Sequence, residues 1–337
     1  MAKESRIAVV IPCYRVRQHI LGVLGRIGTE VWRIYVVDDC CPEQSGALVK
    51  DSVTDPRVEV LFNTENLGVG GATLNGMLRA AADGAEVIVK IDGDGQMNPE
   101  HIQQFADPVT TGLADYAKGN RFFDLDGVAD MPPVRLFGNA MLSFLAKMST
   151  GYWHTMDPTN GYFALHGSLV GVLPVTKISK RYFFESDLLF RLNVLGANVV
   201  DVPMHSKYGE EVSSLNPLKE IPNFGVAHVR NFFKRIFYNY FLRNFSIGSL
   251  ELVIGLVLLI FGVIYGLTHY GTSVPATAGT VMIAALPIII GGQLLLSFLN
   301  YDIQSVPTSP LHLRLKRIAV QPISIDKKPT EAQRAQD

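Results

Sequence analysis

Two long apolar stretches in the last third of the chain limit what the sequence can fold into. Leu252–Leu267 includes no strongly polar side chain and extends back to Gly248, and a second stretch, Ala276–Leu299, follows closely. An α-helix rises about 1.5 Å per residue, so roughly 20 apolar residues cross the ~30 Å hydrocarbon core of a bilayer. The sequence therefore predicts two transmembrane helices, at about 248–267 and 275–299. They form a hairpin with both chain ends on one side.

Basic side chains flank the predicted hairpin on both sides. They are Lys234, Arg235, Arg243, Arg314, Lys316 and Arg317. Because Lys and Arg stay on the cytoplasmic side of membrane helices, we expect an integral membrane protein whose large N-terminal domain and C-terminal tail, 301–337, are cytoplasmic. The three cysteines, Cys13, Cys40 and Cys41, lack metal-ligand spacing and are interpreted as reduced thiols. These cysteines and the compact form of the chain suit a bacterial inner membrane.

The segment before the hairpin, 216–246, has the pattern of an amphipathic helix. Between residues 229 and 245, apolar side chains recur with helical spacing, and most of them are aromatic. They are Val229, Phe232, Phe233, Ile236, Phe237, Tyr240 and Phe241. Arg230 and Arg235 are among the basic residues that lie off this stripe. An aromatic stripe flanked by cations predicts a helix in the membrane interface; a helix packed into a protein core is the alternative.

The first 215 residues have the pattern of an α/β domain. Short apolar runs alternate with helical segments, and the first four runs are Ile7–Ile11, Arg33–Val37, Val58–Phe62 and Glu86–Ile91. Such alternation predicts parallel βαβ units. We expect a Rossmann-like, mostly parallel sheet with helices on both faces.

Polar or glycine-rich residues follow each of these four strands. Parallel strands end at one edge of the sheet, so we expect these residues to meet there in a nucleotide pocket. Polar loops occur at this edge in any α/β fold, which is the alternative interpretation. The residues at this edge are Pro12-Cys13-Tyr14, Asp38-Asp39, Asn66-Leu67-Gly68 and Asp92-Gly93-Asp94.

The fourth strand leads into Asp92-Gly93-Asp94-Gly95-Gln96, which predicts a metal site. Two carboxylates one residue apart can hold a hard divalent cation that also touches phosphate. The alternative is a simple Asp/Gly turn. No G-x-G-x-x-G motif follows the first strand and no P-loop motif is present, which argues against dinucleotide and P-loop folds. The formal net charge of -1 gives no reason to expect nucleic acid binding.

In this order, these motifs and several later ones resemble family 2 glycosyltransferases with the GT-A fold. With its C-terminal hairpin, the whole chain resembles the polyprenyl-phosphate glycosyltransferase branch, which includes dolichol-phosphate mannose synthases and bacterial undecaprenyl-phosphate glucosyltransferases. The motifs are Val10-Ile11-Pro12-Cys13-Tyr14, Val36-Val37-Asp38-Asp39, Asn66-Leu67-Gly68-Val69-Gly70-Gly71-Ala72, Asp92-Gly93-Asp94-Gly95-Gln96, Gly119-Asn120-Arg121, Asp157-Pro158-Thr159-Asn160-Gly161-Tyr162 and Glu185-Ser186-Asp187.

The resemblance implies a hexosyltransferase that uses a UDP- or GDP-linked sugar and a polyprenyl phosphate, for cell-envelope glycan or protein glycosylation. It implies that Asp92, Asp94 and Gln96 hold Mg²⁺ or Mn²⁺ with the diphosphate. Direct displacement at the anomeric carbon would invert its configuration. The processive Q-x-x-R-W motif is absent, so we expect one sugar per lipid. The alternative acceptor is another membrane lipid or a lipid-linked glycan. The implied nucleoside contacts are Pro12, Tyr14, Asp39, Asn66, Gly68 and Asp92.

On the acceptor side, the resemblance implies that Arg121 and Arg135 lie near the acceptor phosphate and that Asp157 is a candidate catalytic base. Asp187 is a second candidate carboxylate. For Asp157 the alternative is an Asx turn, and for Asp187 an acid at a helix start, stabilised by the helix dipole. A phosphate monoester is ionised at pH 7, which reduces the need for a base.

The sequence departs from the family pattern in three places. Arg15-Val16 stands where Asn-Glu is usual, and Cys40-Cys41 follows Asp38-Asp39 where Gly-Ser is usual. The acceptor motif R-x-x-G-x-S-K is replaced by a segment containing His205-Ser206-Lys207-Tyr208-Gly209. The pattern leaves open whether the chain forms a homo-oligomer.

Overall fold

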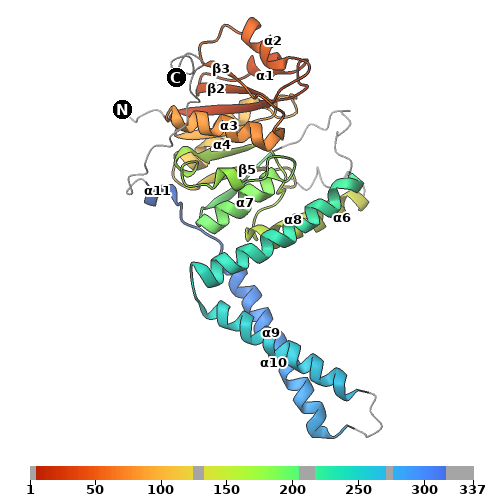
Figure 1. Ribbon diagram of the computed structural model, residues 1–337. Coiled ribbons are helices and arrows are strands. Elements are labelled where there is room, and N and C mark those ends of the chain that lie inside the picture. Colours follow the sequence, from red (N-terminus) through yellow and green to blue (C-terminus); the bar gives the residue numbers. More distant parts are fainter. Residues whose placement is uncertain (1–4, 124–132, 205–216, 271–275, 316–337) are drawn as a thin grey trace, which may run out of the picture.

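The structure is a computed structural model, and it describes residues 5–123, 133–204, 217–270 and 276–315. An α/β domain lies at one end and a helical hairpin extends away from it (Figure 1). A long helix, α8 (Pro217–Phe237), lies between the two.

The α/β domain is built on a seven-stranded sheet with the order β3-β2-β1-β4-β6-β5-β7. All strand pairs are parallel except the two that β6 makes, with β4 and β5. The mostly parallel α/β sheet expected from the sequence is therefore confirmed. The strands are β1 (Ile7–Cys13), β2 (Val31–Asp38), β3 (Val58–Phe62), β4 (Val87–Lys90), β5 (Tyr116–Asn120), β6 (Phe163–His166) and β7 (Val199–Pro203).

Helices cover both faces of this sheet because the central strands are apolar on both sides. In β1, Val10 belongs to one buried core cluster and Val9 to the other. Successive side chains of a strand point to opposite faces, so one apolar run supplies both cores. The helices of the domain are α1 (Ile20–Leu24), α2 (Ser45–Ser52), α3 (Gly68–Ala82), α4 (Ile102–Thr110), α6 (Pro133–Thr150) and α7 (Phe184–Leu195).

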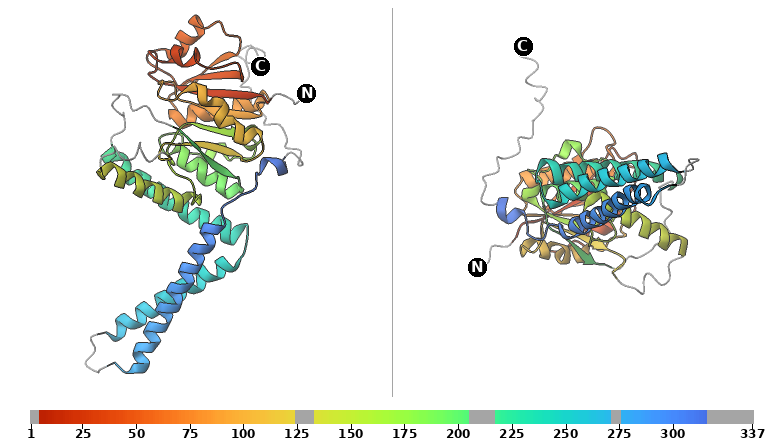
Figure 2. Two further views of the ribbon diagram at one scale, coloured as in Figure 1. Left: turned by 180° about the vertical axis from the view of Figure 1, so that it is seen from behind. Right: turned by 90° about the horizontal axis from the view of Figure 1, so that it is seen from below.

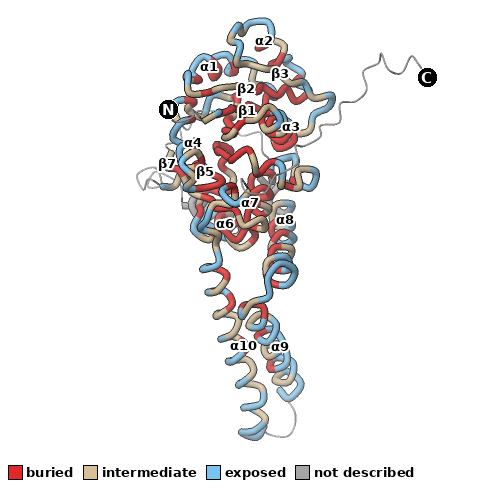
Figure 3. Tube along the Cα trace, turned by 90° about the vertical axis from the view of Figure 1, so that its left-hand side faces the viewer, coloured by how far each residue is buried: buried red, intermediate tan, exposed pale blue. Residues whose placement is uncertain are grey.

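The two apolar stretches form long helices, α9 (Ile247–His269) and α10 (Ala278–Gln304), which pack side by side (Figure 2). Their mean hydropathies are 2.6 and 2.2, and most of their surface is exposed (Figure 3). Both are long and apolar enough to cross a bilayer. Small residues let the backbones approach closely: a Cβ at Gly291 would lie 2.7 Å from the Leu259 nitrogen.

The aromatic stripe before the hairpin is divided between protein core and surface. Ile236 and Tyr240 are buried with Phe298 of α10, whereas Phe233 and Phe237 are exposed. A π-helical turn, Tyr238–Leu242, follows α8 and leads to the hairpin. The core-packing alternative thus describes Ile236 and Tyr240, and for the exposed part of the stripe the interfacial position stays a prediction.

The position of Arg235 differs from the one expected from the sequence, in which Arg235 is one of the cations that flank the membrane helices. Its side chain is buried and forms a two-point ion pair with Asp302 of α10, at 2.6 Å and 2.9 Å. Asp302 also accepts hydrogen bonds from Tyr240 and from the indole of Trp153. The basic residue therefore connects the hairpin to the α/β domain rather than facing lipid headgroups.

The segment after the hairpin returns to the α/β domain and ends in a short helix, α11 (His312–Leu315). The buried carboxylate of Asp115 accepts hydrogen bonds from the backbone nitrogens of Leu311 (2.6 Å) and His312 (2.8 Å). The His312 ring stacks on His166, with centroids 4.2 Å apart. The predicted tail, 301–337, thus begins with the last turn of α10 and continues as a segment that packs on the α/β domain. Its remainder, 316–337, lies outside the described residues.

A buried histidine in α8 makes stability depend on pH. His228 contacts the Ser149 hydroxyl at 2.7 Å and packs against the Phe183 ring, and burial lowers its pKa from 6.5 to about 4. The unfolded chain therefore binds a proton below about pH 6.5 that the folded protein does not bind until about pH 4. Stability is complete above pH 6.5, and about 3 kcal/mol is lost as the pH falls toward 4.

We expect His228→Gln to remove most of this loss, because Gln carries no titrating proton. Thermal unfolding of the detergent-solubilised chain at pH 7 and pH 4.5 measures the effect. The exposed His154, changed to Gln, is the matched control and should keep the wild-type pH dependence. An equally steep loss of stability in the His228 variant would contradict this explanation.

Candidate functional site

A pocket of about 400 Å³ opens at the edge of the sheet where β1, β2 and β4 end. Every residue that the sequence predicted as a nucleoside contact lines it, together with both acids of the predicted metal site. Arg181 and Tyr182, from the loop before α7, complete the lining and were not predicted. The lining residues are Pro12, Cys13, Tyr14, Val16, Asp39, Asn66, Gly68, Val69, Ala72, Asp92, Gly93, Asp94, Arg181 and Tyr182.

The Asp39 carboxylate holds one wall of this pocket in place. One of its oxygens accepts from the Asn63 side chain (2.7 Å) and the Leu67 nitrogen (2.9 Å), and the other accepts from the Gly68 nitrogen (2.7 Å). Gly68 begins α3 with φ at +82°, a conformation that favours glycine. Asp39 therefore fixes the turn that enters α3, besides lining the pocket.

The first acid of the predicted metal site belongs to a buried charge network. The Lys90 ammonium lies 2.7 Å from Asp92 Oδ1 and 3.9 Å from Glu185 Oε1. Burial alone would lower the pKa of Lys90, but the two carboxylates outweigh it and raise the pKa. Burial raises the pKa of Glu185 to about 7 against the opposing effect of Lys90. Lys90 thus holds Asp92 at the pocket. Glu185 contacts the same ammonium group but does not line the pocket.

Neither Lys90 nor Glu185 was predicted as a site residue. The sequence does contain a signal for Lys90: a lysine inside an apolar strand is expected to be buried, and a buried lysine requires an acidic partner. Its position two residues before Asp92 points to that partner. Glu185 belongs to the motif Glu185-Ser186-Asp187, in which the sequence predicts Asp187 as the candidate carboxylate.

Gly161 gives the Lys90–Asp92 pair the space it occupies. A Cβ at this position would lie 2.4 Å from Lys90 Nζ and 3.1 Å from Asp92 Oδ2. We expect Gly161→Ala to displace Asp92 and lower the turnover number by about 100-fold, since ångström-scale misplacement of site groups is that costly. Steady-state kinetics measures the loss. Gly22→Ala, where a Cβ meets nothing within 4 Å, should keep wild-type turnover; equal activities would contradict the role given to Gly161.

Asp94 follows Asp92 on the same rim and lines the pocket, and its Oδ1 accepts from the Gln96 backbone nitrogen at 3.0 Å. Gln96 is exposed and, among the described residues, is not part of the pocket lining. Within the described part of the chain, no group of three or more His, Cys, Asp or Glu could hold a metal. Two carboxylates alone fit Mg²⁺ or Mn²⁺, which take their remaining ligands from phosphate oxygens and water.

Arg121 and Asp157, both predicted on the acceptor side, form a bidentate ion pair. Arg121 Nε and Nη2 each lie 2.7 Å from a carboxylate oxygen of Asp157, and Asn160 donates to the same group. Burial raises the pKa of Asp157, but Arg121 and Asn160 outweigh it and lower the pKa. Because a carboxylate with a lowered pKa is a weak base, this geometry favours a role for Asp157 in orienting Arg121.

The other two predicted acceptor-side residues are placed differently. Arg135 lies in the first turn of α6, and its side chain is outside the described residues, as is the segment His205–Gly209. Asp187 is buried in α7, where it pairs with Arg191 at 3.2 Å and accepts from Asn231 of α8 at 2.9 Å. It lines a second cavity rather than the pocket of Asp92 and Asp94. Its observed contacts join α7 to α8.

The fold and the pocket together define an α/β protein with a pocket at the carboxyl ends of its strands, attached to two helices long enough to span a membrane. A model of the glycosyl transferase family 2 domain matches residues 8–171. Polyprenol monophosphomannose synthase of Mycolicibacterium smegmatis is 32% identical, over 59% of this chain and 77% of that protein. The chain belongs to glycosyl transferase family 2.

Two further relatives carry related names. Undecaprenyl-phosphate mannosyltransferase of Micrococcus luteus is 30% identical, over 59% of this chain and 82% of that protein. UDP-N-acetylglucosamine–dolichyl-phosphate N-acetylglucosaminyltransferase of Methanococcus voltae is 28% identical, over 61% and 88%. Among solved structures, glucosyl-3-phosphoglycerate synthase of Mycobacterium tuberculosis with UDP is 19% identical, covers 68% of this chain and 80% of that chain, and has a TM-score of 0.49.

Proposed function

We propose that this protein is an inverting glycosyltransferase that moves one sugar from a nucleotide sugar to a polyprenyl phosphate. The observation that carries the proposal is the single pocket in which Asp92 and Asp94 meet all the predicted nucleoside contacts. The names of the three relatives, each of which includes a polyprenol or a polyprenyl or dolichyl phosphate, support the acceptor class.

On the donor side, Asp92 and Asp94 would hold Mg²⁺ or Mn²⁺, and the exposed Gln96, outside the pocket lining, is a further candidate oxygen donor. Such a cation would supply positive charge for the leaving diphosphate. Lys90 keeps Asp92 oriented toward the pocket through its 2.7 Å contact. Pro12, Tyr14 and the turn fixed by Asp39 bind the nucleoside.

On the acceptor side, the phosphate is already ionised at neutral pH and is itself the nucleophile. Arginine matches the geometry of phosphate, and Arg121 is held in one orientation by Asp157. Arg135 is the second phosphate ligand. Positioning and charge stabilisation supply most of the rate enhancement, and attack opposite the leaving group produces a β-linked product from an α-linked donor.

The membrane segments retain the acceptor at the site. An isoprenoid chain leaves the bilayer at a cost of about 0.8 kcal/mol per buried CH₂, so the enzyme must work against the membrane surface. In this proposal the hairpin α9–α10 spans a bacterial inner membrane, and flanking basic residues such as Arg243 and Arg314 favour a cytoplasmic position of the α/β domain.

Transfer of a radiolabelled sugar by the full-length chain in detergent tests the acceptor class. A panel of UDP- and GDP-sugars with Mn²⁺, screened first by thermal shift, identifies the donor. Label should then enter polyprenyl phosphate and should not enter diacylglycerol or a lipid-linked glycan. Incorporation into either of the other lipids, with none into polyprenyl phosphate, would overturn the proposal in favour of another membrane acceptor.

A further inference from the structure

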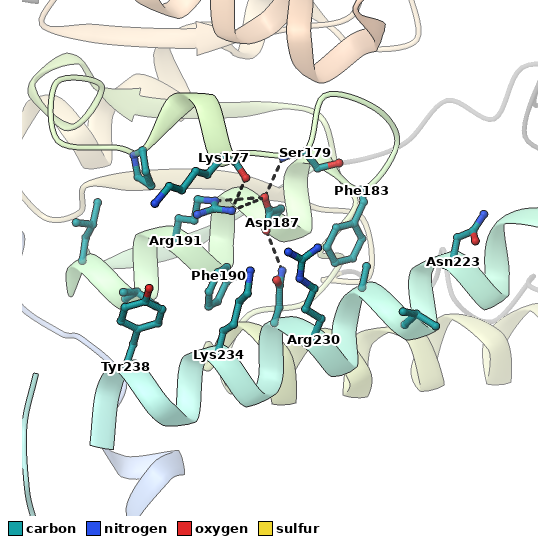
Figure 4. Close-up of a pocket in the computed structure, with 16 residues that line it drawn as sticks. Lys177, Ser179, Phe183, Asp187, Phe190, Arg191, Asn223, Arg230, Lys234 and Tyr238 are labelled. Atoms are coloured by element: carbon teal, nitrogen blue, oxygen red, sulfur yellow. Dashed lines mark hydrogen bonds and ion pairs between the residues drawn. The ribbon is translucent and has the colours of Figure 1, made fainter. Parts of the chain in front are cut away.

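A second cavity, of about 840 Å³, lies between α7 and α8 (Figure 4). It shares no lining residue with the pocket of Asp92 and Asp94. Side chains from the loop before α7, from α7 itself and from one face of α8 project into it. Nothing in the proposed sugar transfer uses this cavity.

Four cations line the cavity: Lys177, Arg191, Arg230 and Lys234. Asp187 is the one carboxylate among the lining residues, and it is already engaged by Arg191. Within the described part of the chain, no carboxylate lies within ion-pair distance of the other three cations. Burial lowers the pKa of Lys234, and the neighbouring Arg230, Arg191 and Lys177 lower it further against the effect of Asp187. The cavity therefore presents crowded positive charge that an anion would relieve.

Apolar surface adjoins these cations. Phe183 and Phe190 form the wall on the side of α7 (Figure 4), and Val226 of α8 also lines the cavity. On α8, the neighbouring line of residues one helical turn apart is apolar and exposed: Val229 at 53%, Phe233 at 66% and Phe237 at 56%. This line runs along α8 toward the π-helical turn that precedes the hairpin. A ligand that fits both features carries an anionic head and an apolar tail.

We propose that this cavity binds the phosphate headgroup of an anionic phospholipid, with its acyl chains along the exposed apolar line of α8. Lys177, Arg230 and Lys234 contact the phosphate, and the lipid holds α8 against the leaflet. Polyprenyl phosphate and free phosphate also carry a phosphate group. The experiment below therefore includes results that distinguish each of them from a phospholipid. The inference does not depend on the proposed sugar transfer.

Native mass spectrometry of the full-length chain, released from detergent with phosphatidylglycerol or phosphatidylcholine, tests the proposal. The wild type should retain phosphatidylglycerol and not phosphatidylcholine. The triple variant Lys177→Gln, Arg230→Gln, Lys234→Gln should retain at least tenfold less, because each surface cation adds to the attraction for anionic lipid. The matched control, Lys50→Gln, Lys147→Gln, Arg26→Gln, removes three cations of the α/β domain that lie outside the cavity and should retain phosphatidylglycerol as the wild type does.

Three results would overturn the proposal. One is equal retention of phosphatidylglycerol by the cavity variant and the wild type. Another is loss of the retained lipid on addition of millimolar inorganic phosphate. The third is a cavity variant that retains phosphatidylglycerol but no longer uses polyprenyl phosphate. If the triple variant does not fold, the unfolding temperature of the wild type is the test. Phosphatidylglycerol must then raise this temperature more than phosphatidylcholine does.

Discussion

Asp94→Asn should lower the turnover number by a hundredfold or more while leaving the fold intact. The substitution keeps the shape of the side chain and removes the charge that, with Asp92, would hold a divalent cation against the leaving diphosphate. Such a cation is worth several kcal/mol of charge stabilisation, and each 1.36 kcal/mol is a tenfold change in rate. Asp94 is the sharper choice of the two acids, because Asp92 also neutralises the buried Lys90.

Initial rates at saturating Mg²⁺ or Mn²⁺, together with the unfolding temperature, measure this effect. Asp51→Asn, which removes an exposed acid of α2 outside the pocket, is the control and should retain wild-type rates. The Asp94→Asn variant should also lose the increase in unfolding temperature that nucleotide and metal together give the wild type. Turnover within twofold of wild type in Asp94→Asn would remove the basis for placing the metal here.

Asp302→Ala should destabilise the protein by about 3–5 kcal/mol, because it leaves the buried Arg235 guanidinium without its counter-ion. The carboxylate accepts from both terminal nitrogens of Arg235, from Tyr240 and from Trp153. These donors come from three segments that join the α/β domain to the hairpin. All of them would lose this acceptor in one step, and Arg235 would keep only the uncharged Met148 carbonyl.

Thermal unfolding in detergent should show a decrease of roughly 10 °C for Asp302→Ala. Asn300→Ala, an exposed change in the same helix, should have little effect. The double variant Arg235→Met, Asp302→Leu should recover much of the loss, because replacing a buried pair by apolar side chains is often neutral. An Asp302→Ala protein as stable as the wild type would contradict the role given to this ion pair.

The sheet, and the grouping of the strand-end residues around one pocket, could be predicted because their signals are local. Val58–Phe62 was expected as a strand and is β3, since an apolar run bounded by turn residues has few alternatives. Parallel strands end at one edge, so residues as distant in sequence as Tyr14 and Asp92 could be assigned to one pocket. The two long helices of the hairpin could be predicted from the length and hydropathy of the two apolar stretches alone.

The pairings between distant segments could not be predicted. Arg235 and Asp302 are 67 residues apart, and Asp115 and His312 are 197 apart. A basic residue near a membrane helix has the same local pattern whether it faces headgroups or a buried acid. Only the packing of α8 on α10 distinguishes these two cases.

The two acids at the start of α7 show a related limit. Glu185 and Asp187 are two residues apart, so on a helix they point about 200° away from each other. One contacts the Lys90 network beside the donor pocket, and the other faces α8 and the second cavity. The motif indicated that an acid matters here, but the rotation of the helix decides which one approaches the site.

Analysis of the lipid product tests the central proposal most directly. The full-length chain is incubated with its nucleotide sugar, Mg²⁺ or Mn²⁺ and a polyprenyl phosphate, and the extracted lipid is examined by mass spectrometry and NMR. We expect one sugar per polyprenyl phosphate, β-linked when the donor is α-linked, and no product after chelation of the metal. A retained α-linkage, a chain of several sugars, or the absence of a lipid product with every nucleotide sugar would contradict it.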